Sequence, residues 1–401
     1  MPAIGIGGGC RGSGGGGGAT AGYVRPTSWL TMPSLSDGDD KIVLLVAVWE
    51  NASNFIALKA STSSGTYTIN WGDGNTSSGI TSAAQSDHVL DYSGLSADTS
   101  AYGYRQSIVT ITADSGNLTV FNLNVRHGSG TNDYATGALE CNIASQSITD
   151  LGDMFRSNNE QKHPWLERFE YIGTCNVTDW AYAFYGSGIQ YFKATAPNAT
   201  DARFLFYSCS IRYLHGKLGS GSCNAQTMLK HATNINEIPS TWDLTGFSDI
   251  GYMISYSSLG TFGTVDNPIA LPDNKDALQF ARQTNTLREV NIASGYFKGN
   301  MQLLFYQSKN LTAVRGLNGT AITSLSNAFY QVYSLQTLDS SNITVSFDLS
   351  DCNFATQGLV DIFNDLASAT ATITVTNNPG TAGLSAANLL IATNKGWTVT
   401  T

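Results

Sequence analysis

The sequence predicts a mainly β protein with minor α structure: a small β-sandwich, then a solenoid of stacked repeats, then an α/β cap at the C-terminus. Three features of the chain predict this arrangement. Short strand-like segments separated by turn residues occupy residues 41–125. An apolar phrase built around a bulky residue recurs every 22 to 29 residues through the middle of the chain. Apolar residues with helical spacing appear after residue 355.

The composition limits the classes of function that the chain can have. Its 401 residues allow two or three domains, and charged residues make up only 13% of them. The net charge of −9 and the scattered 21 Lys and Arg residues exclude the basic stripe that nucleic acid requires. The longest apolar run, Ile42–Trp49, has the length of a strand. The N-terminus has no basic segment followed by an apolar one, so we expect no signal peptide and no membrane insertion.

Residues 1–40 are expected to form a glycine-rich assembly arm. Gly14–Gly18 is an unbroken glycine run, and such a segment cannot bury enough apolar surface to fold alone. Pro26 and Pro33 then favour extended backbone over helix. We expect this arm to become ordered against partner subunits and to lead into the first folded unit. The alternative is a flexible tail.

Residues 41–128 are expected to form the β-sandwich. The strand candidates are short, rich in Val, Ile, Thr and aromatic residues, and separated by turn residues. They span residues 41–49, 54–60, 66–71, 88–92, 105–112 and 117–125. Short strands at this density are typical of a small sandwich.

One turn in this region carries a recognisable sequence. The phrase INWGDG, residues 69–74, contains Trp71 and Asp73 and is followed by His88 and Tyr92. With these residues the domain resembles the polycystic-kidney-disease (PKD) type of immunoglobulin-like domain, in the version common in bacteriophage and bacterial surface proteins. The resemblance implies that Trp71 packs in the core and that His88 is structural. Asp73 would brace the turn through side-chain to backbone hydrogen bonds.

Residues 129–350 are expected to form the solenoid. A bulky residue anchors each repeat in the core: Phe155, Phe184, Phe206, Met228, Tyr256, Phe280, Phe305 and Phe329. Repeats of this length stack the apolar edge of one repeat on the next. The phrase CNVTDWAYAFYGSGIQYF, residues 175–192, resembles the bacterial surface-antigen type of leucine-rich repeat. The resemblance implies a large surface that binds other molecules rather than catalysing a reaction.

Tyrosines flank or occupy these anchors in several repeats. They are Tyr171, Tyr182, Tyr185, Tyr191, Tyr207, Tyr213 and Tyr256. Tyrosine suits adaptable contact surfaces and stacking on sugar rings. We expect some of them to face outward, and the alternative is that they pack at the core or its rim.

Residues 351–401 are expected to form an α/β cap. Apolar residues at helical spacing predict a helix over 356–368. The phrase ATITVTNNPG predicts a strand with a turn, and Ser385 is placed to begin a second helix that ends near Lys395 and is followed by a strand. A solenoid needs such a cap because its last apolar layer would otherwise face water. This ending resembles those of repeat-bearing phage virion proteins.

The sequence contains no recognisable catalytic constellation. The five His residues lie in no protease or hydrolase motif, and the six Cys residues lack zinc-binding spacing and are expected to be free and buried. Glu237, Asp243 and Asp249 are candidates for glycosidase carboxylates but are interpreted as solvated loop residues. Asp73 with Asn75 offers a Ca²⁺ site as the alternative to a structural turn, so the metal content stays open. We predict no catalytic residue and no cofactor.

Together these features predict a non-enzymatic structural protein of a bacteriophage virion, on the tail or the particle surface. The specific expectation is a tail fibre or baseplate-attached receptor-binding protein used in host adsorption. The arm would bind other virion proteins, the solenoid would bind a glycan or protein of the host surface, and the chain would form homo-oligomers. The alternatives are a capsid decoration protein, a bacterial cell-surface adhesin and a polysaccharide-degrading enzyme.

Overall fold

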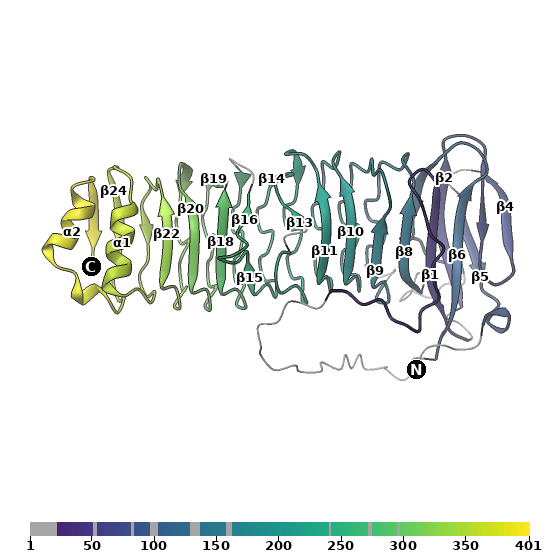
Figure 1. Cartoon of the computed structure of the whole chain (residues 1–401), viewed down its shortest axis with the longest axis horizontal. Helices are drawn as coiled ribbons and strands as arrows, with labels where there is room; N and C mark the ends of the chain where they lie inside the picture. Colours follow the sequence, from purple (N-terminus) through teal and green to yellow (C-terminus); the bar gives the residue numbers. More distant parts are fainter. Residues whose placement is uncertain are drawn as a thin grey trace.

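The computed structural model is an elongated molecule with a β-sandwich at one end, a β-solenoid in the middle and two helices at the other end (Figure 1). It is mainly β, with 34% strand and 7% helix, and the solenoid has about ten turns. The predicted fold class is confirmed at this level. The structure describes residues 22–50, 54–81, 84–96, 103–128, 137–157, 163–239, 242–271, 275–294 and 297–401. The glycine-rich start of the predicted arm, residues 1–21, lies outside them.

Two antiparallel sheets pack face to face at the N-terminal end. One has the order β5-β2-β7 and the other contains β1-β6-β3-β4. The strands are β1 (Lys41–Val48), β2 (Phe55–Thr62), β3 (Thr66–Asn70), β4 (Thr76–Thr81), β5 (Gln85–Val89), β6 (Arg105–Ala113) and β7 (Leu118–Asn122). Each predicted strand is present in this set, although β5 begins before the predicted 88–92. β4 is not among the predicted strands, because its sequence, TSSGIT, is largely polar and exposed.

β1 joins the sandwich to the solenoid. It pairs antiparallel with β6 on one side and with β8 (Ala138–Ala144) on the other. A single nine-stranded sheet therefore runs from β4 in the sandwich to β13 in the solenoid, across the expected boundary at residue 128. Every residue from Ile42 to Val48 is buried. Because both faces of β1 are covered, its residues do not alternate between apolar and polar, which explains the continuous apolar run in the sequence.

The described part of the arm lies against the outer face of this sheet. Trp29 packs with Leu45 and Leu139 in a small apolar cluster and is only 7% exposed. The Arg25 guanidinium donates to the buried Glu140 carboxylate at 2.6 Å. This part of the arm is therefore ordered against the chain's own sheet, which supplies the apolar partner that the arm sequence lacks.

The solenoid adds parallel strands coil by coil. One ladder extends the nine-stranded sheet through β9 (Arg168–Tyr171), β10 (Tyr191–Ala196), β11 (Tyr213–Leu218) and β13 (Trp242–Asp243). The later coils use a second ladder of β15 (Thr261–Phe262), β18 (Glu289–Ser294), β20 (Ala313–Asn318) and β22 (Thr337–Ser341), with β16 (Ile269–Ala270) beside β18. A separate sheet contains β12 (Cys223–Asn224), β14 (Phe247–Asp249), β17 (Lys275–Asp276), β19 (Phe297–Asn300) and β21 (Ala321–Ser324).

Bulky side chains fill the inside of the coils. The ring of Phe184 lies 5.7 Å from that of Phe155 and 5.8 Å from that of Phe206, between centroids. All the predicted anchors except one are buried. The exception, Tyr256, is wrong as an anchor: it is half-buried at a surface turn, and Ile254 occupies the core in this coil.

The C-terminal cap follows the predicted order of helix, strand, helix and strand. Its elements are β23 (Phe347–Asp348), α1 (Thr356–Asp365), β24 (Ala371–Thr374), α2 (Ala386–Thr393) and β25 (Trp397–Thr400). Ser385 caps α2 in a reciprocal capping box with Asn388. The Lys395 ammonium donates to the carbonyls of Phe363 and Leu366 at 3.2 and 2.8 Å, which caps the last turn of α1.

Two further expectations concern cysteine and membranes. The five described cysteines are buried free thiols, as predicted, and Cys10 lies outside the described residues. None of the described helices combines the length and the apolar character that crossing a bilayer requires.

Removal of a core ring is expected to destabilise the solenoid strongly. Phe184→Ala and Phe206→Ala should each lower the free energy of unfolding by about 3–5 kcal/mol, because truncation of a buried ring leaves a cavity. Tyr256→Ala is the matched control at the surface and should cost less than about 1 kcal/mol. Urea denaturation followed by circular dichroism measures all three. A loss below about 1 kcal/mol for either Phe variant would contradict a shared core.

Candidate binding surface

One side of the solenoid is built from a repeated turn. In coil after coil an Asp, Asn or Ser side chain accepts a hydrogen bond from the amide two residues later, as Asp179 does from Ala181 at 2.8 Å. The equivalent residues are Asp150, Asp201, Asn224, Asp249, Asn300, Ser324 and Asp348. This side-chain turn is one that Asp, Asn and Ser favour. This turn therefore sets the position at which the next backbone segment begins, and that position is equivalent from coil to coil.

The backbone then passes through the left-handed region at non-glycine residues. The first such residues are Asp153, Tyr182, Phe204, Thr227, Tyr252, Gln279, Leu303 and Asn327, with φ between 52° and 61°. This conformation costs an ordinary residue about 1–2 kcal/mol. Hydrogen bonds to the next coil hold it, for example from the amide of Tyr182 to the carbonyl of Arg203 at 3.0 Å. The turn side chains therefore meet their counterparts from adjacent coils.

These side chains form a continuous row that we call the aromatic stripe. Its members are Arg156, Tyr182, Tyr185, Phe204, Tyr207, Lys230, His231, Tyr252, Tyr256, Arg282, Tyr306 and Tyr330, all half-buried or exposed. Tyr182 stacks on Phe204 with 4.6 Å between centroids. Tyr185 stacks on Tyr207 at 4.8 Å, with only 2° between the ring planes. Stacking this regular shows that the turns keep the same register from coil to coil.

His231 and Arg282 continue the row between Tyr207 and Tyr306: His231 supplies an imidazole ring and Arg282 a cation. The His231 ring lies 4.8 Å from that of Tyr256. The guanidinium carbon of Arg282 lies 6.0 Å from the ring centroid of Tyr256 and 5.4 Å from that of Tyr306. Tyr306 then stacks on Tyr330 at 5.2 Å, and Tyr330 is 47% exposed. The chain of ring and cation contacts thus reaches the turn that starts at Ser324.

The stacking decides what the stripe offers to a ligand. The faces of Tyr185 and Tyr207 cover each other, so a sugar ring cannot lie flat against both. Both rings are half-buried, and neither hydroxyl group bonds to another described residue. Beside the rings, the side-chain amides of Gln283, Gln307 and Gln331 bond to one another in a ladder at 2.5 and 2.7 Å. The stripe therefore presents a row of hydrogen-bonding groups rather than flat platforms.

The structure separates the predicted tyrosines into three groups. Four belong to the stripe: Tyr182, Tyr185, Tyr207 and Tyr256. Tyr191 and Tyr213 lie on β10 and β11 instead, where Tyr23 of the arm packs on both rings at 5.0 and 5.8 Å. Tyr171 is buried, with its hydroxyl bonded to a backbone carbonyl. The two cations that the prediction missed, Lys230 and Arg282, are the charged members of the middle of the stripe.

The carboxylate of Asp73 is hydrogen-bonded within the protein at both oxygens. One carboxylate oxygen of Asp73 accepts from the amide of Asp91 at 2.9 Å and lies 2.8 Å from Nε2 of His88, and the other accepts from the amide of Asn75 at 3.0 Å. Burial opposes the charge, but these hydrogen bonds outweigh it and lower the pKa of Asp73 to about 2. His88 stacks on the buried Trp71 at 4.7 Å. Both carboxylate oxygens therefore have protein partners, which favours the structural interpretation over Ca²⁺ binding.

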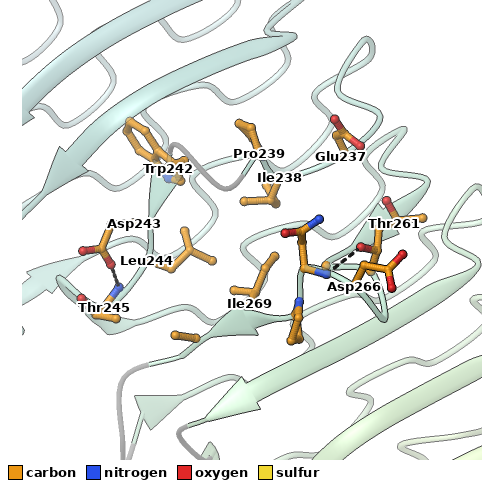
Figure 2. Close-up of a pocket in the computed structure, with 15 residues that line it drawn as sticks. Glu237, Ile238, Pro239, Trp242, Asp243, Leu244, Thr245, Thr261, Asp266 and Ile269 are labelled. Carbon is orange, nitrogen blue, oxygen red and sulfur yellow. Dashed lines mark hydrogen bonds between the residues drawn. The ribbon is translucent and has the colours of Figure 1, made fainter. Parts of the chain in front are cut away.

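The glycosidase candidates do not come together in one place. Asp249 belongs to the repeated turn and accepts from the amide of Gly251 at 2.7 Å. Glu237 and Asp243 line a groove of about 690 Å³ between the two strand ladders, and Figure 2 shows them on opposite sides of it. Burial opposes the charge on Asp243, yet the Lys217 ammonium 2.8 Å away helps to lower its pKa. Across the described residues, no group of His, Cys, Asp and Glu is arranged to hold a metal ion.

Comparison of the chain with known protein families, with curated proteins and with solved structures finds no match. The functional interpretation therefore depends on the surfaces described above.

Acid should weaken the sandwich through Asp73. The pKa of Asp73 in the fold, about 2, is below its ordinary value of 3.8, so the ionised carboxylate stabilises the fold above about pH 4. That contribution, about 2 kcal/mol, is lost as the pH falls towards 2. Asp73→Asn should be less stable at pH 7 and should lack this part of the acid-dependent loss.

Urea denaturation at a series of pH values measures the effect. Asp266→Asn, a control in an exposed loop, should keep the wild-type pH dependence. If Asp73→Asn shows the same acid-dependent loss as the wild type, the assignment to Asp73 is wrong.

Proposed function

We propose that this chain is a non-enzymatic structural protein of a bacteriophage particle and acts as a tail fibre or baseplate-attached receptor-binding protein in host adsorption. The observation that carries the proposal is the aromatic stripe, in which the same turn positions recur along stacked coils. A polymeric ligand that lies along the stripe meets similar groups in each coil. Host-surface polysaccharides are polymers of this kind, and weak contacts to them add up when many copies bind together.

The finer fold assignment belongs to the same proposal. We propose that the coils are leucine-rich repeats of the surface-antigen type and that the sandwich is a PKD-like spacer. The contacts among Trp71, Asp73 and His88 support the PKD likeness. The pairing of β1 with β6 and of β7 with β2 departs from it, because an immunoglobulin-like order places the seventh strand beside the sixth. Here β1, and not the seventh strand, lies beside β6, and the other edge of β1 pairs with β8 of the solenoid.

The arm is proposed to join the chain to other virion proteins and to further copies of itself. The Tyr23 hydroxyl donates to Glu167 at 3.1 Å, and Arg25 pairs with Glu140. These contacts fix the place on the solenoid to which the glycine-rich residues 1–21 are attached. Glycine allows close approach of one backbone to another, which suits a segment that assembles against partner subunits.

Capsid decoration and bacterial adhesion are the alternative functions, and they differ from the main proposal in location. Antibody labelling of purified particles, viewed by electron microscopy, distinguishes them. We expect label at the tail. Label on the capsid shell would favour decoration, and label on the bacterial envelope in the absence of particles would favour an adhesin.

Loss of the stacked tyrosines is expected to weaken host binding. Full-length chain displayed in many copies on beads should retain host envelope polysaccharide, and Tyr185→Ser with Tyr207→Ser should lower that retention about tenfold, because several weak contacts are lost at once. The control is Trp165→Ser, which removes an aromatic side chain that is 39% exposed and lies outside the stripe. It should bind as the wild type does.

Two results would contradict this proposal. Release of reducing ends at enzyme-like turnover during the incubation would overturn the non-enzymatic assignment. A loss of retention in Trp165→Ser but not in the double Tyr variant, with all variants melting normally, would move the binding surface away from the stripe.

A further inference from the structure

We propose that the middle of the aromatic stripe, formed by Lys230, Tyr256 and Arg282, is a subsite for the carboxylate groups of an acidic polysaccharide. The inference rests on the proposed role of the stripe in glycan binding and adds the charge of the glycan. Lys230 comes from the coil before Tyr256 and Arg282 from the coil after it. The Lys230 ammonium lies 5.6 Å from the Tyr256 ring centroid, and the Arg282 guanidinium carbon lies 6.0 Å from it.

These two cations differ from the others along the stripe because no carboxylate balances them. Arg156 pairs with Asp153 at 2.8 Å. Within the described part of the chain, neither Lys230 nor Arg282 forms an ion pair with a carboxylate. Arg282 donates instead to the neutral side chain of Gln279 at 2.7 Å, and its Nε is buried without a hydrogen-bond partner. No carboxylate among the described residues therefore neutralises the pair.

After the Asp, Asn or Ser that starts each turn, the turns around this pair contain no acidic residue, although the protein as a whole is acidic. The chain has 30 Asp and Glu against 21 Lys and Arg. The turn segments without a single Asp or Glu are 181–186, 203–208, 226–231, 251–256, 278–283, 302–307 and 326–331. In these segments Arg203 is balanced by Asp201, which starts the same turn, at 2.6 Å. The middle of the stripe is thus a positive surface on a negative protein, which attracts an anionic ligand.

The two cations also repel each other. Burial and the nearby Arg282 both lower the pKa of Lys230, so the field of one cation acts on the other. This arrangement destabilises the protein without a ligand. A carboxylate bound between the two groups would relieve the repulsion and accept charge-assisted hydrogen bonds from both. Uncompensated charge of this kind collects at functional sites.

The surroundings of the pair favour a sugar polymer over a nucleic acid. Tyrosine hydroxyl groups and the Gln283–Gln307–Gln331 ladder provide donors and acceptors in successive coils, about 4.8 Å apart. Hydroxyl groups of a polysaccharide that runs along the stripe would meet this polar row. A nucleic acid has a phosphate on every nucleotide and needs cations all along its path. The described stripe has only two cations without a carboxylate partner, so its chemistry fits occasional negative charges on a hydroxyl-rich polymer.

The test compares charged and uncharged forms of the same polymers. Full-length chain is displayed on beads and offered polygalacturonate, hyaluronan or polysialic acid, each beside its carboxyl-reduced form, which keeps the sugars and loses the charge. We expect about tenfold stronger retention of at least one acidic polymer than of its reduced form, and a fall in that retention as salt rises. Lys230→Gln with Arg282→Gln should abolish the preference. The matched control, Lys217→Gln with Arg315→Gln, removes the same charge from ion pairs with Asp243 and Glu289 and should keep it.

Each outcome decides one part of the proposal. Equal retention of acidic and reduced polymers, or an unchanged preference in the Lys230 and Arg282 double variant, would overturn the carboxylate subsite and leave glycan binding in place. Absence of retention for every polymer and for host envelope polysaccharide would overturn glycan binding as well. Capture of single-stranded DNA that depends on Lys230 and Arg282 would assign the pair to nucleic acid and also overturn the inference. A melting curve for each variant confirms that the fold is kept.

Discussion

Hydrogen bonds between successive coils are the interaction on which the rest of the structure depends. In the turns, the amides of Tyr182 and Phe184 donate to the carbonyls of Arg203 and Leu205 one coil further on, at 3.0 and 3.1 Å. The parallel strands repeat this pairing elsewhere around each coil. The bonds keep equivalent residues of adjacent coils roughly 4.8 Å apart. The buried Phe contacts and the stacked rings of the aromatic stripe both follow from this spacing, and so does the persistence of left-handed residues that would otherwise relax.

A ladder of this kind has two open ends, and the chain closes them by different means. At the N-terminal end β1 pairs with both β6 and β8, so the sandwich completes the first sheet of the solenoid. At the C-terminal end α1 packs against β22, and Lys395 bonds to the last carbonyls of that helix. Pairing of β1 with β8 and packing of α1 on β22 cover strand edges of the solenoid that would otherwise be able to pair with other chains. The sandwich and the cap therefore contact the two ends of the solenoid directly.

The outline of the fold could be predicted from the sequence, whereas the register within each coil could not. A Tyr that directly follows an anchoring Phe is a signal that would have added Tyr306 and Tyr330 to the stripe. The same rule fails for Lys230, because the large residue of its coil, Met228, stands one position earlier in the turn than Phe206 does in its own. Tyr256 is misassigned for a related reason: coils of unequal length allow the bulkiest residue to stand at an outward position. Only the hydrogen-bond pattern between coils resolves these shifts.

In the part of the chain that the structure describes, charged side chains are paired on the strand surface of the first coils but unpaired in the middle of the aromatic stripe. On the strands Glu140 accepts from both Arg25 and Arg168, and Arg168 also donates to Glu170. Opposite charges there lie beside each other in adjacent strands, and the arm covers part of them. The charges on that surface balance one another without a ligand.

The middle of the stripe places two cations against one ring, and no carboxylate among the described residues balances them. The turns that carry them are already strained by left-handed backbone. The repulsion between these cations costs stability, and one Asp or Glu at a neighbouring outward position would reduce it. Folding alone therefore does not explain why the repulsion is kept. This contrast between a balanced surface and an unbalanced one, more than any single residue, is the reason for placing the proposed binding function on the stripe.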